Sequence, residues 1–138
     1  MNQWNERNRQ VIDSFRANRG TTGGPFADRP MLLLTTTGAR SGKPFTTPLV
    51  YLADGDRLVI FASKGGAPSH PDWYHNLVAN PRVTVEVGSD TYEAKAEVLS
   101  GEERDRLYAR QAELMPNFGD YQAKTSRTIP VIALRRAD

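Results

Sequence analysis

The sequence contains no cysteine and only two histidines among its 138 residues. Without cysteine, neither a disulfide framework nor a thiolate metal site can form, and two histidines without further nearby ligands give no reason to expect a metal centre. No apolar run approaches the roughly 20 residues that span a bilayer. The first residues, which include Glu6, Arg7 and Arg9, lack the apolar stretch of a secretory signal. We therefore expect a cytoplasmic protein.

A strong excess of charge is also lacking, because the formal net charge is only +2. The cations are too few and too scattered to indicate nucleic acid as the main partner. The length is that of one domain, which can bury a core without a disulfide or a structural metal. We expect an N-terminal helix within residues 1–20 and a β-rich body over residues 21–138.

Hydrophobic periodicity predicts the secondary structure of both parts. Helices are expected over 3–19, 72–79, 101–114 and, for about a turn, 118–124. A loop rich in Gly and Pro is expected over 20–30, and six strands at 31–37, 45–52, 57–63, 83–87, 91–99 and 129–134. Short turns link most neighbouring strands, which indicates antiparallel pairing. The predicted fold class is α+β, mainly β: a six-stranded antiparallel split β-barrel with flanking helices.

The predicted N-terminal helix is amphipathic. Trp4, Val11, Ile12 and Phe15 share one face, and Arg and Asn residues occupy the other. A helix of this kind usually docks on the core of its own domain. A basic amphipathic helix also suits a membrane surface, so peripheral membrane contact through this helix is the alternative.

Residues 34–49, LTTTGARSGKPFTTPL, form the most informative motif. Only three residues separate Gly38 from Gly42, and Pro44 and an extended run follow Lys43, so the motif does not fit a Walker P-loop. It predicts a hairpin whose turn exposes backbone N–H groups beside the cations of Arg40 and Lys43. Such a turn can bind a phosphate or carboxylates. Taken alone, it also fits an ordinary hairpin with solvated charges.

Three other segments carry candidate groups. Phe61–Gly66 (FASKGG) ends a predicted strand with glycines, which let the backbone approach a flat ligand, and adds a third cation at Lys64. In the helix over 72–79, Asn76 needs a partner that a ligand could supply, whereas Trp73 is more typical of a core. Near the C-terminus, Tyr121 could donate a hydrogen bond to a substrate oxygen.

Five blocks, taken in order, resemble a known family. They are Leu34–Leu49, Ala62–Ala67 (ASKGGA), Pro71–Pro81 (PDWYHNLVANP), Gly101–Asp105 (GEERD) and Asp120–Pro130 (DYQAKTSRTIP). Together they are similar to the deazaflavin-dependent nitroreductase family, actinobacterial split β-barrel oxidoreductases that use coenzyme F420. The resemblance covers about residues 24–136.

The resemblance implies hydride transfer from reduced deazaflavin to a hydrophobic acceptor such as a quinone, an enone or a nitroaromatic compound. The positions implied for the anionic tail of the coenzyme are Ala39, Arg40, Ser41, Phe45, Thr46, Thr47 and Lys64, with Lys43 as a substitute cation. Those implied for the ring and its ribityl chain are Phe61, Ala62, Ser63, Asp72, Trp73, Tyr74, His75, Asn76 and Phe118. Tyr121 and Ser63 would assist catalysis by hydrogen bonding.

The chain also departs from the family pattern. Ala39 and Phe45 stand where better-known members carry cations, which implies weaker tail binding. Met115 and Phe118 stand where nitroimidazole-activating members carry tyrosines, which favours an apolar acceptor such as a quinone over a nitro compound. The alternatives are a non-catalytic protein that binds a flavin-like or lipid ligand, and a relative that uses FMN. The sequence is compatible with a monomer or a homodimer.

Overall fold

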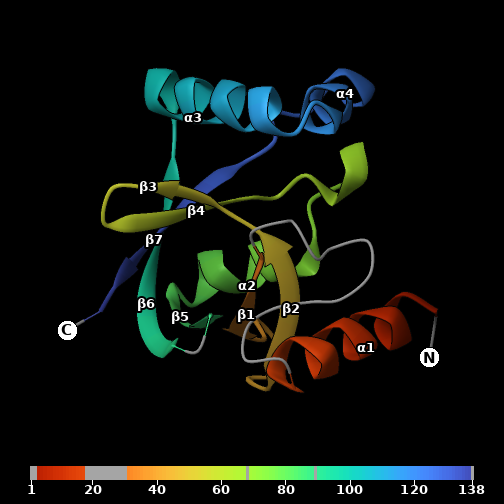
Figure 1. Cartoon of the computed structure of the whole chain (residues 1–138), viewed down its shortest axis with the longest axis vertical. Helices are drawn as coiled ribbons and strands as arrows, with labels where there is room; N and C mark the ends of the chain where they lie inside the picture. The colour runs from red at the N-terminus through yellow and green to blue at the C-terminus, as the bar shows by residue number, and fades with distance from the viewer. Residues whose placement is uncertain (1–2, 18–30, 68, 89, 138) are drawn as a thin grey trace.

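A computed structural model describes residues 3–17, 31–67, 69–88 and 90–137 of the chain (Figure 1). These residues form four α-helices, a short 3-10 helix and seven strands. The elements are α1 (Gln3–Ala17), β1 (Met31–Thr37), β2 (Pro44–Val50), β3 (Leu52–Asp54), β4 (Arg57–Phe61), η2 (Lys64–Gly66), α2 (Asp72–Ala79), β5 (Arg82–Val87), β6 (Asp90–Leu99), α3 (Gly101–Leu114), α4 (Asn117–Lys124) and β7 (Val131–Arg136).

All seven strands belong to one sheet, in the order β2-β1-β5-β6-β7-β4-β3, and every pair in it is antiparallel. The two edge strands, β2 and β3, are consecutive in the chain and are joined by Tyr51 alone. Because neighbouring Cα atoms are 3.8 Å apart, Val50 and Leu52 cannot be more than about 7 Å from each other. The sheet must therefore curl until its two edges meet at this corner, which gives a split barrel.

The predicted fold class is confirmed, with seven strands in place of the six expected. The difference comes from the predicted strand over 45–52, which the structure divides at Tyr51 into β2 and β3. Val50 is the last residue of β2 paired with β1, and Leu52 is the first residue of β3 paired with β4. The chain thus changes its partner strand inside one extended run. Pro44 and Pro48 fit β2 because an edge strand tolerates missing amide donors.

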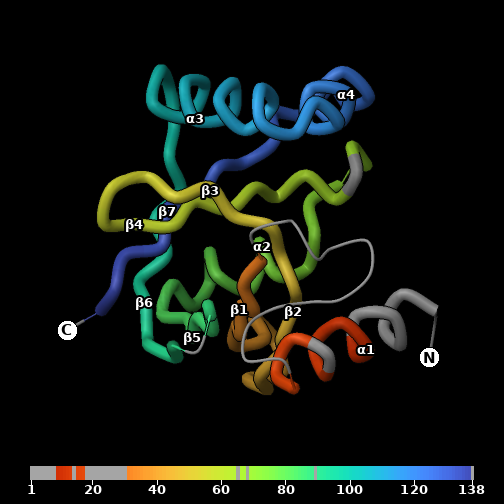
Figure 2. Tube along the Cα trace, viewed as in Figure 1, coloured from red at the N-terminus to blue at the C-terminus, as the bar shows by residue number. Residues whose placement is uncertain are grey.

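Strands β4 and β7 are buried on both faces and separate two cores. Ile60 and Ile132 face a cluster that includes Trp73 and Leu77 of α2. The alternate residues on the same strands face a second cluster beneath α3 and α4, to which Val59, Phe61, Val131, Ala133 and Phe118 belong. Continuous apolar runs are typical of strands covered on both sides. Figure 2 shows α3 and α4 lying together over one end of the curled sheet.

Helix α1 packs on β2, and its Phe15 is buried. Near its end, Arg16 forms an ion pair with Glu86 of β5 at 2.8 Å. The predicted position of Trp4 and the predicted loop over 20–30 lie outside the residues and side chains that the structure describes. Within the described part of the chain, no helix is both long and apolar enough to cross a membrane.

Candidate functional site

The turn between β1 and β2, residues 38–43, is the first candidate segment. Gly42 has a φ of +70°, which suits glycine in a tight reversal. The Gly38 amide donates to the carbonyl of Lys43 at 2.8 Å, and the Gly42 amide donates to the carbonyl of Gly38 at 3.0 Å. The Lys43 amide donates to Oγ of Ser41 at 3.2 Å. The expectation that this turn exposes its backbone N–H groups is therefore wrong for these three residues, because their amides donate to acceptors within the turn.

Asn76 of α2 ties this turn to the body of the protein. Its Oδ1 accepts a hydrogen bond from the amide of Ala39 at 3.0 Å, and its Nδ2 donates to Oγ1 of the buried Thr36 at 3.2 Å. The partner that Asn76 was expected to need is thus the chain itself. Below the turn, the hydroxyl groups of Thr35 and Thr46 lie 2.8 Å apart across the strand pair. What the turn offers a ligand is therefore its side-chain cations and the amides of Arg40 and Ser41, which bond to no other described residue.

The second candidate segment is the loop over residues 62–70. Lys64 has a φ of +47°, and it is the only non-glycine residue with a positive φ in the described part of the chain. A side chain in this conformation costs on the order of 1–2 kcal/mol, which points to a function at the position. Gly66, with a φ of +82°, lies so close to α4 that a Cβ atom would stand 2.8 Å from the carbonyl oxygen of Tyr121. The loop is thus strained and closely packed at once.

Sequence reasoning missed the residue that holds this loop. Arg127 donates from Nε to the carbonyl of Ala67 at 2.8 Å and from Nη1 to that of Ala62 at 3.0 Å. Its Nη2 donates to the carbonyl of Ser63 at 2.7 Å, and Nη1 lies 3.0 Å from Nδ1 of His70. Arg127 lies within the last of the resembling blocks, but backbone carbonyls are partners that no residue pattern reveals.

His70 connects the loop to α2. Its ring lies 4.7 Å from that of Tyr74 and 5.8 Å from that of His75, measured between centroids. Burial, followed by the charges of Arg127 and His75, lowers the pKa of His70. Because Arg127 can only donate, His70 accepts through a neutral Nδ1 in this arrangement. The lowered pKa agrees with that hydrogen bond.

The aromatic residues predicted for the ring of the coenzyme are mostly core residues. Phe61, Trp73 and Phe118 are 5%, 7% and 4% exposed, respectively. Tyr121 is partly buried, with its ring 5.2 Å from that of Phe118, and its hydroxyl oxygen accepts a hydrogen bond from Nδ2 of Asn117 at 2.7 Å. The Tyr121 O–H group can therefore still donate a hydrogen bond to another acceptor.

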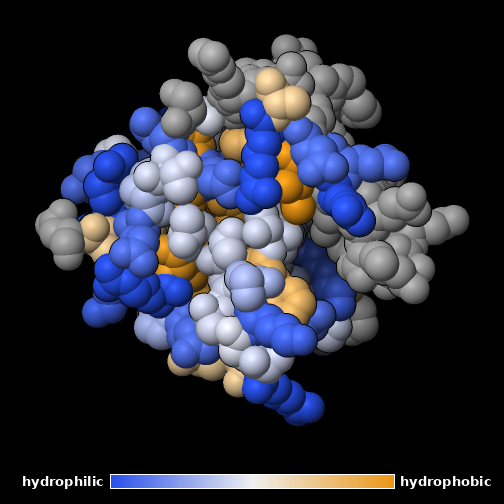
Figure 3. Space-filling model, turned by 90° about the horizontal axis from the view of Figure 1, so that it is seen from below, coloured by the Kyte–Doolittle hydropathy of each residue, from blue (hydrophilic) through white to orange (hydrophobic). Residues whose placement is uncertain are grey.

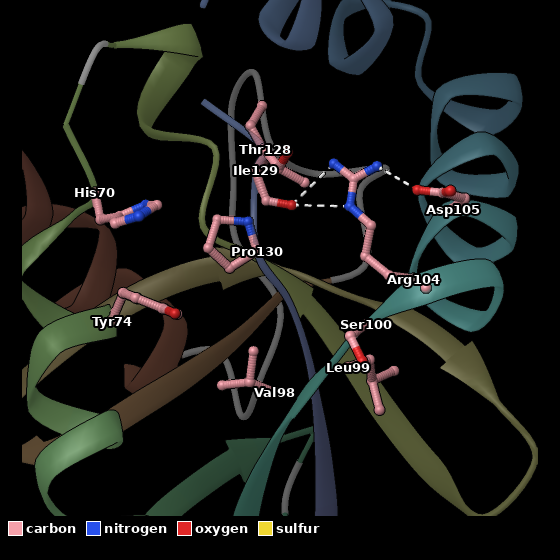
Figure 4. A pocket seen from close by; sticks show the side chains of 11 residues that line it. His70, Tyr74, Val98, Leu99, Ser100, Arg104, Asp105, Thr128, Ile129 and Pro130 are labelled. Carbon is pink, nitrogen blue, oxygen red and sulfur yellow. Dashed lines mark hydrogen bonds and ion pairs between the residues drawn. The ribbon is translucent and has the colours of Figure 1, made fainter. Parts of the chain in front are cut away.

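A cavity of about 290 Å³ opens beside these segments (Figure 4). Its walls come from the end of β6, the start of α3, α2 and residues 128–130, and include His70, Tyr74, Val98, Arg104 and Pro130. The N–H groups of the Arg104 guanidinium are engaged within the protein, because they donate to the carbonyl of Ile129 and to Gln122. Of the residues predicted for the coenzyme, only Tyr74 lines this cavity, which therefore lies next to the predicted site.

Helix α2 brings the predicted segments into one site. His70 joins the loop over 62–70 to Tyr74 and His75 of α2, and the next residue, Asn76, joins the turn over 38–43. Successive residues of a helix point in directions about 100° apart, so the two segments meet α2 at neighbouring residues and on different sides. Figure 1 shows the turn near the lower end of the molecule and the loop higher, with α2 between them. We call the surface formed by the turn, the loop and α2 the track.

The charges along this track fit a polyanionic ligand. Arg40, Lys43 and Lys64 are exposed, and no carboxylate in the described part of the chain forms an ion pair with any of them. The other arginines of that part are often paired, as Arg57 is with Asp54 and Glu103. Figure 3 shows the lower face of the molecule as largely hydrophilic, with small hydrophobic areas. Exposed cations of this kind suit phosphate or carboxylate groups.

The sequence over residues 7–136 matches the F420H2-dependent quinone reductase family. The chain belongs to this family. Membership confirms the resemblance seen in the sequence, together with the expected enzyme class, an F420-dependent reductase, and the expected cofactor.

Individual proteins that are similar to this chain agree with the family assignment. An F420H2-dependent quinone reductase of Mycobacterium tuberculosis, strain H37Rv, is 45% identical over 128 residues, which cover 88% of this chain and 85% of the relative. A solved F420H2-dependent reductase is 42% identical, with a TM-score of 0.72 over 82% of this chain and all of the other. A structure described as a domain-swapped dimer is 40% identical, with a TM-score of 0.73 and coverage of 96% and 97%. A heme storage protein of Vibrio cholerae, 15% identical with a TM-score of 0.61, shares the fold alone.

Proposed function

We propose that the protein reduces a quinone, or a similar conjugated ketone, with F420H2 bound along the track beside α2. The observation that carries this proposal is a set of exposed cations, Arg40, Lys43 and Lys64, which form no ion pair within the described residues and lie on two segments that contact α2. When bound, reduced F420 supplies a hydride. The protein itself must therefore bind and orient the coenzyme and the acceptor, and exclude water.

Arg40 and Lys43 would bind the carboxylates of the tail. Both are exposed side chains on a turn whose backbone is fixed by its own hydrogen bonds and by Asn76. The turn therefore offers two mobile cations on a rigid base. Such a base suits a tail of several carboxylates, because long side chains can follow charges that are spread along a chain.

Lys64 and Ser63 would lie nearer the reacting end. The carbonyl of Ser63 is held by Arg127, and the side chain of Lys64 extends from a strained backbone. Tyr121, on the neighbouring helix α4, would donate its O–H to the oxygen of the acceptor, since its own oxygen is occupied by Asn117. A fixed donor of this kind stabilises the negative charge that develops on a ketone oxygen.

Coenzyme titration tests the binding half of the proposal. Wild type should bind F420 at micromolar concentration, and the double variant Arg40→Ala, Lys43→Ala should bind it on the order of tenfold more weakly. A deazaflavin without the charged tail should bind both proteins equally. If the double variant weakens both ligands alike, the turn does not bind the tail.

Turnover tests the other half. Wild type should oxidise F420H2 with menadione, and Tyr121→Phe should lower kcat on the order of a hundredfold while leaving the affinity for F420 unchanged. Binding of F420 without turnover across quinones, enones and nitroaromatics would favour the non-catalytic alternative. A yellow protein with bound FMN would favour the FMN-using alternative.

We also propose a cytoplasmic homodimer, a state supported by the relative described as a domain-swapped dimer. The packing of α1 on β2 and the burial of Phe15 favour a helix docked on its own sheet over one on a membrane. Light scattering tests the dimer. Flotation with anionic vesicles tests the membrane, and recovery of the protein with the vesicles would reverse this preference.

A further inference from the structure

We propose that Arg127 is a positioning residue of the coenzyme site: it shapes the loop over 62–70 so that Ser63 and Lys64 are presented to the coenzyme. This inference rests on the proposed function. Arg127 was absent from the residues that the sequence indicated.

The contacts of Arg127 are concentrated on this loop. Four of the five N–H donors of its guanidinium are engaged, three with the carbonyls of Ala62, Ser63 and Ala67 and one with His70. Its own backbone is held in turn, because Gln122 donates to the Arg127 carbonyl at 2.7 Å. A single side chain thus joins both ends of the loop to a fixed point.

These contacts also decide which backbone groups the loop can offer. Each peptide unit is rigid and planar, and its C=O and N–H point in opposite directions. With the carbonyls of Ala62 and Ser63 held on Arg127, the amides of Ser63 and Lys64 must point away from it. No hydrogen bond joins either amide to another residue of the described chain. The same restraint keeps Lys64 at a φ of +47°.

Arg127 is poorly suited to bind the coenzyme directly. It is partly buried, and its donors are taken by neutral backbone oxygens and a histidine nitrogen. Burial also lowers the pKa of its guanidinium. It therefore acts through the loop, which distinguishes it from Lys64.

Arg104 provides a matched control. It too is a partly buried arginine that binds a backbone carbonyl, that of Ile129, and it contacts Gln122 and the ring of Tyr108. It makes no hydrogen bond to the loop over 62–70 in the described structure. Arg127→Lys and Arg104→Lys should each lower the melting temperature, but only the first should loosen the loop.

The experiment measures three quantities on both variants and wild type. Hydrogen exchange of the protein without coenzyme should be at least tenfold faster at Gly66 and Ala67 in Arg127→Lys, because their amides bond within the loop. The dissociation constant for F420 should rise on the order of tenfold, with kcat at saturating coenzyme within about threefold of wild type. Arg104→Lys should change both far less, because Arg104 reaches the loop only indirectly, through Gln122 and Arg127.

Two results would overturn the proposal: unchanged loop exchange and F420 affinity in Arg127→Lys despite a lower melting temperature, or equal losses in both variants. If Arg127→Lys does not fold, Arg127→Gln, which keeps two N–H donors, takes its place with the same expectations. If wild type itself fails to bind F420, the proposed function fails, while the exchange rates still decide whether Arg127 shapes the loop.

Discussion

The two segments that α2 holds are built in opposite ways. The turn over 38–43 binds three of its amides within itself and that of Ala39 to Asn76, has an open glycine at Gly42 and carries exposed cations. The loop over 62–70 depends on a distant arginine, has a crowded glycine at Gly66 and holds its lysine in a strained conformation. The turn is a rigid base that carries mobile charges, whereas the loop has a backbone whose conformation is fixed by Arg127.

This contrast matches two different tasks. A flexible tail of carboxylates needs charge over some distance, and small errors in position cost little. A reacting ring needs its neighbours in place before it binds, because ordering them afterwards would reduce affinity and rate. We therefore expect changes in the loop to have larger effects than matched changes in the turn.

The sharpest comparison is between two glycines. Gly66→Ala should destabilise the protein by about 2–4 kcal/mol, because a Cβ there adds both left-handed strain and a collision with α4. Gly42 has a similar φ but open space around it, so Gly42→Ala should lower the stability by only about 1 kcal/mol. Chemical denaturation measures both. Equal losses would show that the loop is no more tightly packed than the turn.

The next comparison is between two cations. Lys64→Gly should weaken F420 binding on the order of tenfold, and Arg40→Ala only about threefold, since Lys64 is held in place before binding. Lys64→Gly should leave the melting temperature nearly unchanged, because relief of the positive φ offsets the added freedom of the unfolded chain. A larger loss of affinity in Arg40→Ala would reverse the assignment of tasks.

Asn76 joins α2 to the turn over 38–43 and to Thr36 of β1, and its replacement tests how strongly this link stabilises the protein. Asn76→Ala should destabilise the protein by about 1–2 kcal/mol, because Thr36 loses its partner inside the core and Ala39 loses its acceptor. Adding Thr36→Val should recover part of this loss by removing the unpaired hydroxyl. A double-mutant cycle measured by denaturation gives the coupling, and strict additivity would contradict the proposed link.

The smallest expected effect is a pH dependence centred on His70. Its pKa is lowered in the folded state, by burial and by Arg127 and His75, so the unfolded chain takes up the proton first as the pH falls. The stability is therefore fully present above about pH 6.5, the usual histidine pKa, and declines below it. His70→Asn keeps an acceptor for Arg127 and should flatten this decline. If the stability of the variant depends on pH as that of wild type does, groups other than His70 cause the decline.

Much of the fold could be predicted because local patterns agree with it. The bounds of β1 match the prediction, 31–37, and the alternation of Val83 and Val85 with polar residues marks β5 as half-buried. The division at Tyr51 could not be predicted, since neither glycine nor proline marks it and both halves remain extended. It follows from closure of the whole sheet.

The site was only partly predictable for a similar reason. The segments were found from their glycines and cations and then from their resemblance to a family, and the roles of their individual residues remain predictions. The amides of the turn and the polar atoms of Asn76 were expected to face a ligand, but Asn76 binds Ala39 and Thr36, and three other amides bind within the turn. Arg127 escaped notice because its partners are carbonyls, which every residue carries.

The corner at Tyr51 also bears on solubility. In most open sheets the two edges lie far apart, and each can recruit a strand from another molecule. Here the covalent chain ties the start of one edge to the end of the other, and denaturant cannot break that tie as it breaks hydrogen bonds. Added residues at the corner would let the edges separate. The length of this one link therefore helps to limit how readily the sheet adds foreign strands.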